Sequence, residues 1–367
     1  MPPVRLAVVG VGNNISALLQ GIHLYKGVEG DAEKLPGVTR VDVGGLHVTD
    51  IDIVAAFDVS SRKVGLELSE AVFAEPNNYP RIVEHLPPTG TVVSMGAQLD
   101  GVPSHLADTV EPAVGDRTVD DIADEIRASG AEVLLYSLPT GSSKAALFYA
   151  EVALRASVAF VNCTPEAVAR DPEIAARFTE AGVAIVGDDL ASHLGSSVVH
   201  RTVLGLVADR GLAVDRSYQV NLGGNADFKN LLVRGEAKRE SKFNALAGVS
   251  TENVSIVPSG GFLPVLGDQK VGYVYVEALG WGGTPATIEL KLSVQDSSNA
   301  AGVIVDLIRL AAVAQRAGVA GPVHGAGSLL KSPPPGDRDV SPHAFERSVA
   351  ELRSGAALPV AAGGDSA

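Results

Sequence analysis

The sequence predicts an α/β fold, a doubly wound parallel sheet with a second, inserted α+β domain. Short β-branched runs alternate with helical segments from the N-terminus to about residue 190, the order typical of a parallel sheet. After residue 217 the pattern changes to alternating strands at 253–257, 271–277 and 286–294, which favour a separate, more antiparallel sheet. The chain has 367 residues, more than one ordinary core holds, so two domains are expected.

Composition and charge exclude several classes of function. Hydrophobic residues make up 46% and charged residues 20% of the chain, which is typical of a globular protein. The net charge of −14 argues against nucleic acid as a partner, because phosphate binding needs a basic surface. A single cysteine, Cys163, excludes an intrachain disulfide and fits a reducing compartment. There is no signal-peptide pattern and no apolar run of about 20 residues, so we expect a cytoplasmic protein without a membrane span.

The N-terminal segment has the layout of a dinucleotide site. A β-branched strand, a glycine-rich turn and a helix follow one another at residues 4–9, 10–14 and 15–25. The turn supplies four residues that we expect at the cofactor: Gly10, Gly12, Asn13 and Asn14. Ile15 replaces the third glycine of the usual fingerprint, so an ordinary strand-to-helix turn is the alternative.

The second strand, at 51–57, ends in Asp58. A carboxylate there would bind a ribose hydroxyl and favour NAD over NADP. The spacing from the first glycine is longer than usual because residues 26–47 resemble an inserted loop. The alternative is that Asp58 only caps a following helix at 59–68.

Polar residues also follow the later strands of the first sheet. They are Ser137 and Thr140 after strand 132–136, Asn162 at the end of strand 157–162, and Asp188 and Asp189 after strand 183–186. Because ligands bind beyond the carboxyl ends of parallel strands, we expect these residues to share one cleft with Asp58. Helix capping is the alternative for each of them, and an acid/base or cation site is a further interpretation of the paired aspartates.

The next turn leads into a helix around 199–207. Ser192, Gly195 and Ser196 precede that helix, where hydroxyls and backbone N–H groups can cradle a phosphate. A simple capped helix start is the alternative.

Segment 221–242 carries a pair of lysines. If the segment is helical, Lys238 and Lys242 lie on one face, where their charges repel unless an anion lies between them. The alternative is a solvated face on which Glu236 and Glu240 pair with the lysines. Further charged residues occur in loop 260–270, before the apolar helix 302–317 and before a proline stop: Asp268, Lys270, Asp296 and Lys331.

Taken in order, seven motifs resemble the myo-inositol-1-phosphate synthase family in its shorter, actinobacterial-like form. They are GVGNN at 10–14, VGDD at 186–189, LGGNADF at 222–228, KRESK at 238–242, GDQK at 267–270, QDSSNAAGVIVD at 295–306 and LLKSPP at 329–334. The resemblance runs from about Val4 to Pro335.

The resemblance implies conversion of D-glucose 6-phosphate to 1L-myo-inositol 1-phosphate, with NAD regenerated in each turnover. The steps are oxidation at C5, enolisation, aldol closure of C6 onto C1 and reduction at C5. Several fixed cations in one pocket would stabilise the oxyanions that develop. Lys238 would handle the proton of the C5 hydroxyl, Lys242 and Lys270 would hold phosphate and oxyanions, and Lys331 would assist enolisation and closure. Crowding should depress the pKa values of these lysines.

The matching positions define the expected site. The catalytic set is Lys238, Lys242, Lys270, Lys331, Asp189 and Asp296. The substrate-binding set is Asn225, Asp227, Asp268, Ser192, Gly195 and Ser196. The cofactor-binding set is Gly10, Gly12, Asn13, Asn14, Asp58, Ser137, Thr140, Asn162 and Asp188. No His/Cys cluster marks a tight metal site, and an activating ammonium, potassium or divalent cation stays open.

The family resemblance also implies the domain order. A Rossmann-type NAD-binding domain would comprise residues 1–197 and 299–350, interrupted by a catalytic and oligomerisation domain at 198–298 that builds a homotetramer. Residues 351–367 would form a flexible tail.

Departures from the family leave the substrate open. The stretch before Lys238 is shorter than usual, Phe243 to Leu246 stand where a hydroxyl residue is common, and loop 243–270 is unusually apolar. A paralogue that closes another sugar phosphate, such as fructose 6-phosphate, to a five-membered ring would need the same lysines. A simple NAD-dependent dehydrogenase and a non-catalytic NAD-binding regulator are the alternatives from other classes.

Overall fold

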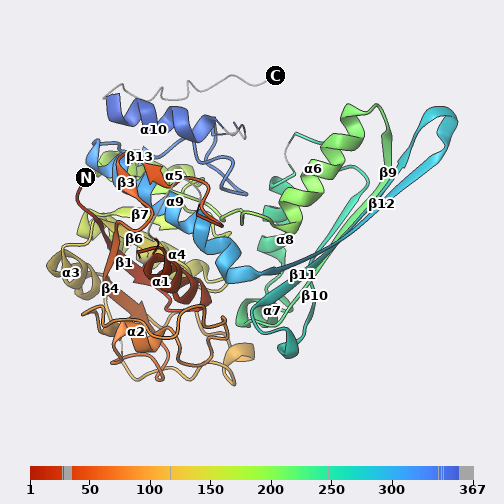
Figure 1. Ribbon diagram of the computed structural model, residues 1–367. Helices are drawn as coiled ribbons and strands as arrows, with labels where there is room; N and C mark the ends of the chain where they lie inside the picture. Colours follow the sequence, from red (N-terminus) through yellow and green to blue (C-terminus); the bar gives the residue numbers. More distant parts are fainter. Residues whose placement is uncertain are drawn as a thin grey trace.

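The protein is built around two sheets that lie side by side (Figure 1). The computed structural model describes residues 1–26, 28, 35–115, 117–246, 248–337, 339, 341 and 343–354. The larger sheet has seven strands in the order β13-β8-β7-β6-β1-β4-β5, and all of its pairings are parallel. Its strands are β1 Val4–Val9, β4 Ile51–Asp58, β5 Val93–Met95, β6 Val133–Tyr136, β7 Ala159–Asn162, β8 Ala184–Val186 and β13 Gly321–Pro322.

The doubly wound parallel sheet predicted from the sequence is confirmed. From β1 the chain runs outward to β4 and β5, and then returns to the other side of β1 as β6, β7 and β8. The strand order therefore reverses between β1 and β6, and a crevice opens at such a switch point beyond the carboxyl ends of the strands.

Helices cover both faces of the large sheet because alternate strand residues point to opposite sides. On one face, α1 (Asn13–Lys26) and α9 (Asp296–Arg316) pack against a cluster that includes Val4, Leu6 and Val8. On the other face, α3 (Val119–Ser129) and α4 (Ser143–Ala156) pack on a cluster that includes Ala7 and Val9. Both faces are thus apolar, which explains the nearly continuous hydrophobic runs of these strands.

The second sheet has the order β10-β9-β11-β12. It consists of β9 (Ala213–Gly223), β10 (Val254–Phe262), β11 (Gln269–Leu279) and β12 (Pro285–Gln295). Only the β10–β9 pairing is parallel among these strands, so the sheet is more antiparallel than the first, as predicted. Helices α6 (Ser196–Asp209) and α8 (Glu236–Asn244) pack on one face, and the β11–β12 hairpin extends beyond them in Figure 1.

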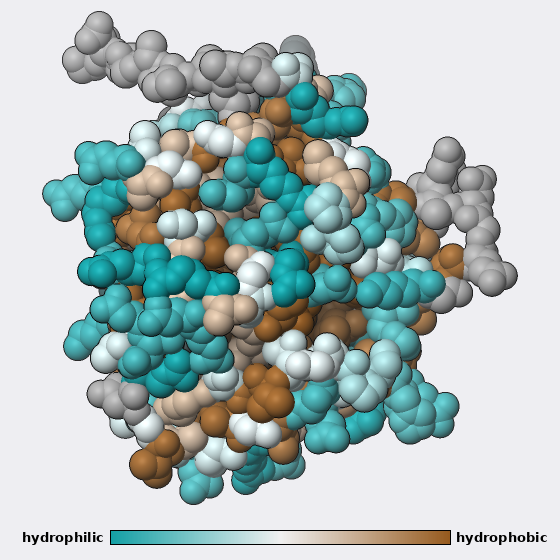
Figure 2. Space-filling model, turned by 90° about the vertical axis from the view of Figure 1, so that its left-hand side faces the viewer, coloured by the Kyte–Doolittle hydropathy of each residue, from teal (hydrophilic) through white to brown (hydrophobic). Residues whose placement is uncertain are grey.

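Smaller elements complete the described chain. They are the hairpin of β2 (Asp42–Val43) and β3 (Leu46–His47), α2 (Leu68–Ala71), α5 (Pro172–Glu180), α7 (Ala226–Leu231), α10 (Ala344–Ser354) and three 3₁₀ turns at 104–106, 264–266 and 281–283. On the side of the molecule seen in Figure 2, hydrophilic residues predominate and hydrophobic residues gather in small separate patches.

Three local predictions were wrong. Residues 59–67 form turns between two isolated bridges, at Ser60 and Glu67, instead of a helix, because Asp58 accepts from the N–H groups of Val59 and Ser60 and Gly65 has a φ of 88°. The inserted segment 26–47 contains the β2–β3 hairpin in its described part. The tail predicted from residue 351 begins inside α10, which continues to Ser354, and residues 355–367 lie outside the described residues.

Helix α9 is long and apolar enough, by length and composition alone, to cross a membrane, but most of it is buried inside the protein. Core helices can be equally long and apolar, and α9 packs against the large sheet through Val303, Ile304 and Leu307. Its apolar composition is therefore explained by burial in the core.

Candidate active site

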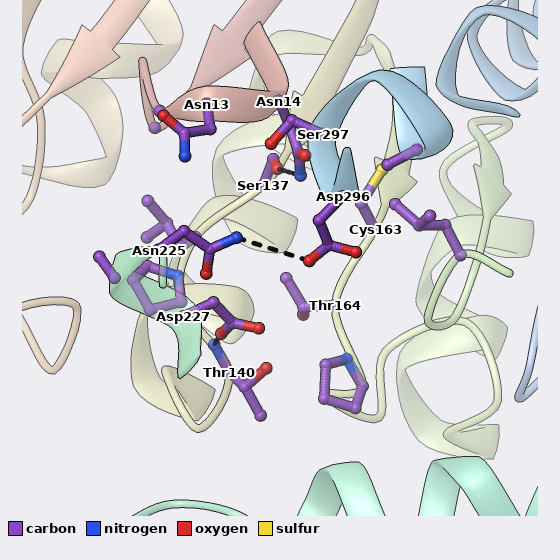
Figure 3. A pocket seen from close by; sticks show the side chains of 18 of the residues that line it. Asn13, Asn14, Ser137, Thr140, Cys163, Thr164, Asn225, Asp227, Asp296 and Ser297 are labelled. Atoms are coloured by element: carbon purple, nitrogen blue, oxygen red, sulfur yellow. Dashed lines mark hydrogen bonds between the residues drawn. The ribbon is translucent and has the colours of Figure 1, made fainter. Parts of the chain in front are cut away.

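One cleft lies where the two sheets meet. It is lined from the large sheet by the turn after β1 and the ends of β4 and β6, and from the second domain by α6, α7, α8 and the start of α9. Figure 3 shows residues from both sides pointing into this space, among them Asn14 and Ser137 on one side and Asn225 and Asp227 on the other. The predicted common cleft therefore exists, although not every predicted residue reaches it.

The glycine-rich turn has the geometry that a dinucleotide needs. Gly10 has a φ of 86°, and a Cβ there would lie 2.7 Å from the carbonyl oxygen of Ser137, so only glycine fits. At Gly12 a Cβ would meet no atom within 4 Å among the described residues, so the space in front of the turn is open. Helix α1 starts immediately afterwards at Asn13, which directs its N-terminal N–H groups toward the cleft end of the turn. These residues fit a pyrophosphate.

Asp58 lies at the end of β4 beside the turn. Its carboxylate accepts from the N–H of Val11 at 2.8 Å, and its other oxygen accepts from the N–H of Ser60 at 2.9 Å. Asp58 thus lines the cleft and fixes local backbone, but it caps no helix at 59–68, and its contact with a ribose stays a prediction. Lys63, which sequence reasoning missed, lies 4.0 Å from the same carboxylate.

The lysines gather around the buried carboxylate of Asp189. Helix α8 places Lys238 and Lys242 one turn apart, as predicted. Lys238 donates to Oδ1 of Asp189 at 3.1 Å, Lys331 donates to the same oxygen at 2.9 Å, and the hydroxyl of Ser241 donates to Oδ2. The two lysine ammonium groups are thus held together by one carboxylate.

A backbone pairing brings Lys331 to this position. The N–H of Lys331 donates to the carbonyl of Asp189 at 2.7 Å, and Asp188 and Ser332 exchange two backbone hydrogen bonds. Asp189 itself has a φ of 53°, a left-handed conformation that aspartate tolerates better than most residues. Because neighbouring residues of paired chains point to opposite sides, Asp188 and Asp189 face different surroundings.

A second ion pair lies across the cleft from Lys238 and Lys331, and together these lysines and Lys242 are called the lysine site. Lys270, at the start of β11, lies 3.0 Å from Asp296 at the N-terminus of α9. Asn225 donates to the other oxygen of Asp296 at 3.5 Å, as Figure 3 shows. Asp227 accepts from the N–H of Thr140 at 3.4 Å, which joins α7 to the turn after β6.

The lysines differ in their pKa values. Burial and the charges of Lys270 and Lys331 hold the pKa of Lys242 well below its ordinary value. Burial also lowers the pKa of Lys331 to about 8, against the opposing effect of Asp189. For Lys238 burial acts in the same direction, but Asp189 and Asp227 outweigh it, so its pKa is raised. The expected depression of pKa values is therefore wrong for Lys238.

The pKa values of the buried carboxylates are also shifted in opposite directions. Burial would raise the pKa of Asp189, but Lys238 and Lys331 lower it well below the usual range. The pKa of Asp296 is also lowered, because the charge of Lys270 outweighs the opposing effect of burial. Burial raises the pKa of Asp268 to about 6.

Lys242 rests on a buried polar layer between α6 and β9. It is 4% exposed and donates to the hydroxyl of Ser196 at 3.3 Å. Ser196 in turn donates to Asn221 at 2.6 Å and accepts from Gln219 at 2.8 Å. Ser192, Gly195 and Ser196 all line the cleft, at the N-terminus of α6.

Four predicted residues, Asn162, Asp188, Asp189 and Asp268, lie behind the cleft instead of lining it, and Asp189 is linked to the cleft only through its lysine partners. Asp188 is fully buried, where it accepts from Asn162 at 2.8 Å and from the N–H of Ala169 at 3.0 Å, and burial raises its pKa. The structure therefore does not bring Asn162 and Asp188 to a cofactor. Asp268 accepts from Asn13 at 3.0 Å and from Ser297 at 2.7 Å, so it connects the glycine-rich turn to α9 and does not line the cleft.

Several lining residues were missed by sequence reasoning. They are Lys63, Asn77, Ser197, Arg201 and Ser297. The hydroxyl of Ser197 is buried without a hydrogen-bond partner among the described residues. Its place after Ser196 in the predicted phosphate turn was the one available signal, whereas Lys63 and Asn77 belong to segments without a motif. Among the described residues, no group of three His, Cys, Asp or Glu side chains is arranged to hold a metal ion.

Comparison with known proteins gives consistent matches over most of the chain. The family model described as myo-inositol-1-phosphate synthase matches residues 195–297. Inositol-3-phosphate synthase of Mycolicibacterium smegmatis is 44% identical over 343 residues, which cover 90% of this chain and 93% of that protein. The enzyme of the same name from Corynebacterium glutamicum is 41% identical over 344 residues, with 90% and 93% covered. The crystal structure of Ari2 is 49% identical, with a TM-score of 0.82 and coverage of 96% and 98%.

Proposed function

The chain belongs to the myo-inositol-1-phosphate synthase family, and we propose that it converts D-glucose 6-phosphate to 1L-myo-inositol 1-phosphate with NAD as a regenerated cofactor. It is an isomerase of the intramolecular-lyase type. The observation that carries a cyclisation, in place of a simple oxidation, is the gathering of four lysines, Lys238, Lys242, Lys270 and Lys331, in one cleft with a dinucleotide turn; glucose 6-phosphate as the substrate is supported by the names of the relatives. A dehydrogenase needs the turn but has no use for so many buried cations.

The cofactor end of the cleft would hold NAD. Gly10, Gly12 and the start of α1 offer the close approach and N–H groups that a pyrophosphate needs, and Asp58 faces the cleft where a ribose hydroxyl would lie. Ser137 and Thr140 would contact the remainder of the dinucleotide. When bound, NAD supplies reversible hydride transfer.

The phosphate of the substrate would lie at the N-terminus of α6. Ser196 and the adjacent N–H groups face this end of the cleft, and Lys242 lies beside Ser196, to which it donates a hydrogen bond. A phosphate dianion there would stabilise the protonated form of Lys242, whose pKa is held low by burial and by the neighbouring lysines.

The two lysines that pair with Asp189 would have different roles in proton transfer. Lys331, with a pKa of about 8, can exist as the neutral amine near neutral pH and would accept a proton from the substrate. Lys238 has a raised pKa and would stay an ammonium that stabilises oxyanions at C5 and at the enolate. Lys270, paired with Asp296, would stabilise oxyanion charge from the other wall. Lys238 would then act as a fixed cation more than as a base.

We also propose that the second sheet builds a homotetramer. Its face opposite α6 and α8 carries the exposed Tyr273 and Tyr218, and Tyr218 stacks on the half-buried Tyr275 with ring centroids 5.0 Å apart. Trp281 at the tip of the β11–β12 hairpin is 98% exposed. Apolar surface of this kind marks protein–protein contacts. The division into domains at 1–197 with 299–350 and at 198–298 follows the same proposal, and we expect the assembly to work in the cytoplasm.

A second candidate is cyclisation of a different sugar phosphate to a five-membered ring. The observation that favours it is the wall of the cleft formed by Ala245 and Pro258, which belong to the two segments that depart from the family pattern. Phe243, in contrast, packs against the core of the second domain and is not among the residues that line the cleft.

A product assay separates these candidates. The enzyme is incubated with NAD and one of glucose, fructose or mannose 6-phosphate, and products are followed by ³¹P and ¹³C NMR. We expect myo-inositol phosphate from glucose 6-phosphate without net NADH. A five-membered cyclitol phosphate from fructose 6-phosphate would establish the second candidate, stoichiometric NADH would indicate a dehydrogenase, and no cyclitol from any substrate would refute both cyclisations. Repeating the assay with ammonium, potassium or Mg²⁺ shows whether a cation activates the enzyme.

A further inference from the structure

The backbone of the cofactor turn is fixed on both sides of Val11, between Gly10 and Gly12. On one side its N–H donates to Asp58 at 2.8 Å. On the other side its carbonyl accepts from the ammonium of Lys63 at 2.7 Å and from the amide of Asn77 at 3.0 Å. The conformation of the turn therefore depends on two side chains of opposite charge.

Lys63 is an unusual choice for a purely structural contact. It is 3% exposed, its other hydrogen bond goes to the neutral amide oxygen of Asn77 at 2.8 Å, and its closest carboxylate, Asp58, is 4.0 Å away. Burying an ammonium with mainly neutral partners is unfavourable. A neutral donor is enough to hold a carbonyl, as Asn77 shows at the same oxygen.

The position of the charge supplies a reason for it. Lys63 lines the cleft together with Gly12 and Asp58, the residues proposed to receive the dinucleotide. A cation there offsets the negative charge of Asp58 and attracts an anionic ligand. Burial lowers the pKa of Lys63 and Asp58 opposes this shift, so an added anion would further favour the charged form.

We propose that Lys63 is a positioning residue for the cofactor, which fixes the glycine-rich turn through Val11 and balances the charge of Asp58. This inference rests on the proposed use of NAD. It has two consequences: the affinity for NAD depends on Lys63, and Lys63 becomes an attractive site for a ribose 2′-phosphate when Asp58 is neutral.

Isothermal titration calorimetry of the full-length protein tests the first consequence. In Lys63→Met we expect NAD to bind at least about tenfold more weakly, because one hydrogen bond from a charged group to the turn is lost. Glucitol 6-phosphate, which lacks the aldehyde that ring closure needs, should bind within about twofold of wild type, since the lysine site is unchanged. The matched control is Arg62→Met, at an exposed neighbour that pairs with Glu75, and it should leave both affinities unchanged.

The second consequence gives a measurement that a structural role would not change. Asp58→Asn should lower the preference for NAD over NADP, and adding Lys63→Met should remove the gain in NADP binding. Should Lys63→Met fail to fold, Lys63→Gln, which keeps a neutral donor for Val11 but removes the charge, is measured in its place, and the gain in NADP binding of Asp58→Asn should again be lost in the double variant.

The outcomes are distinguishable. NAD binding within twofold of wild type in the Lys63 variant, or equal weakening of NAD and glucitol 6-phosphate, would overturn this inference alone. An NADP gain that persists in the double variant would overturn the charge-balancing role. A wild-type protein that binds no NAD would overturn the proposed function as well.

Discussion

Lys331 donates to Oδ1 of Asp189 over 2.9 Å, although 142 positions separate the two residues in sequence. Lys238 reaches the same oxygen from α8. One buried carboxylate thus holds two lysines whose pKa values move in opposite directions, lowered for Lys331 and raised for Lys238. This asymmetry is the basis for assigning a base and a cation within one pair.

Asp189→Asn should abolish most of the activity and destabilise the protein. Without the carboxylate, two buried ammonium groups repel each other, and removing one partner from a buried ion pair costs about 3–5 kcal/mol. We expect turnover to fall by at least ~10³-fold, a loss of about 4 kcal/mol in transition-state stabilisation. Product assays and thermal unfolding check this, with Asp339→Asn, at an exposed pair with Arg347, as the control. Near wild-type turnover in Asp189→Asn would contradict the shared-carboxylate arrangement.

The rate should depend on the neutral form of Lys331. Because its pKa is about 8, we expect kcat/KM to rise as pH increases toward 8 and to level off above it. Lys331→Met should lose this limb together with most of the activity, whereas Lys26→Met, at an exposed lysine paired with Asp52, should keep both. A rate that is flat between pH 7 and 9 in the wild type would rule out Lys331 as the base.

Stability should rise in alkaline solution for the same reason. The pKa of Lys331 is about 8 in the folded protein and 10.5 ordinarily, so between these pH values the unfolded chain binds more protons than the folded one. The free energy of unfolding therefore increases with pH across this window, and Lys242, with its lowered pKa, contributes in the same direction. Thermal unfolding between pH 7.5 and 9.5 measures the slope. Lys331→Met should reduce it, and an unchanged slope would show that this lysine is not the titrating group.

Asp268 should make NAD binding sensitive to mild acid. Its carboxylate accepts from Asn13 of the cofactor turn, and burial raises its pKa to about 6. Protonation below pH 6 removes an acceptor from Asn13, so we expect NAD affinity to fall about threefold to tenfold between pH 7.5 and 5.5, in line with one hydrogen bond.

Calorimetry at the two pH values checks this expectation. Asp268→Asn should bind NAD weakly at both, and Asp108→Asn, whose carboxylate is exposed beside Lys229, should behave as wild type. The same shift affects stability. Between pH 3.8 and 6 the carboxyl of Asp268 is protonated in the folded protein but ionised in the unfolded chain, so its contribution to the free energy of unfolding falls as pH rises through this window. If the NAD affinity of the wild type did not change with pH, Asp268 would not control NAD binding.

The exposed sheet face should determine the oligomeric state. Tyr273→Asp places a charge among the aromatic residues of β9 and β11, and we expect it to shift a tetramer to smaller species. Light scattering coupled to size-exclusion chromatography measures this shift. Leu24→Asp, at a similarly exposed position on α1, is the control. An unchanged mass for Tyr273→Asp would place the interface elsewhere.

Local pattern was enough for the architecture of this protein. Alternation of strands and helices predicted the parallel sheet, and the four-residue spacing of Lys238 and Lys242 predicted one helix face, because both depend on contacts between neighbours in sequence. The glycine-rich turn was found in the same way. Where local pattern competed with distant partners it failed: residues 59–68 have helical spacing, yet Asp58 and the packing of Lys63 under the turn hold them in another conformation.

The tertiary structure alone decided which polar residues belong to the site. Asp188 and Asp189 are adjacent and chemically identical, but pairing with segment 329–332 turns one toward Asn162 and the other toward Lys238 and Lys331. Lys63 and Asp268 likewise acquire their roles from partners 52 and 255 positions away. The sequence by itself determined the elements and the supply of cations. Which charges meet, and hence which lysine is proposed as the base, depends on long-range pairing and burial, for which no local spacing exists.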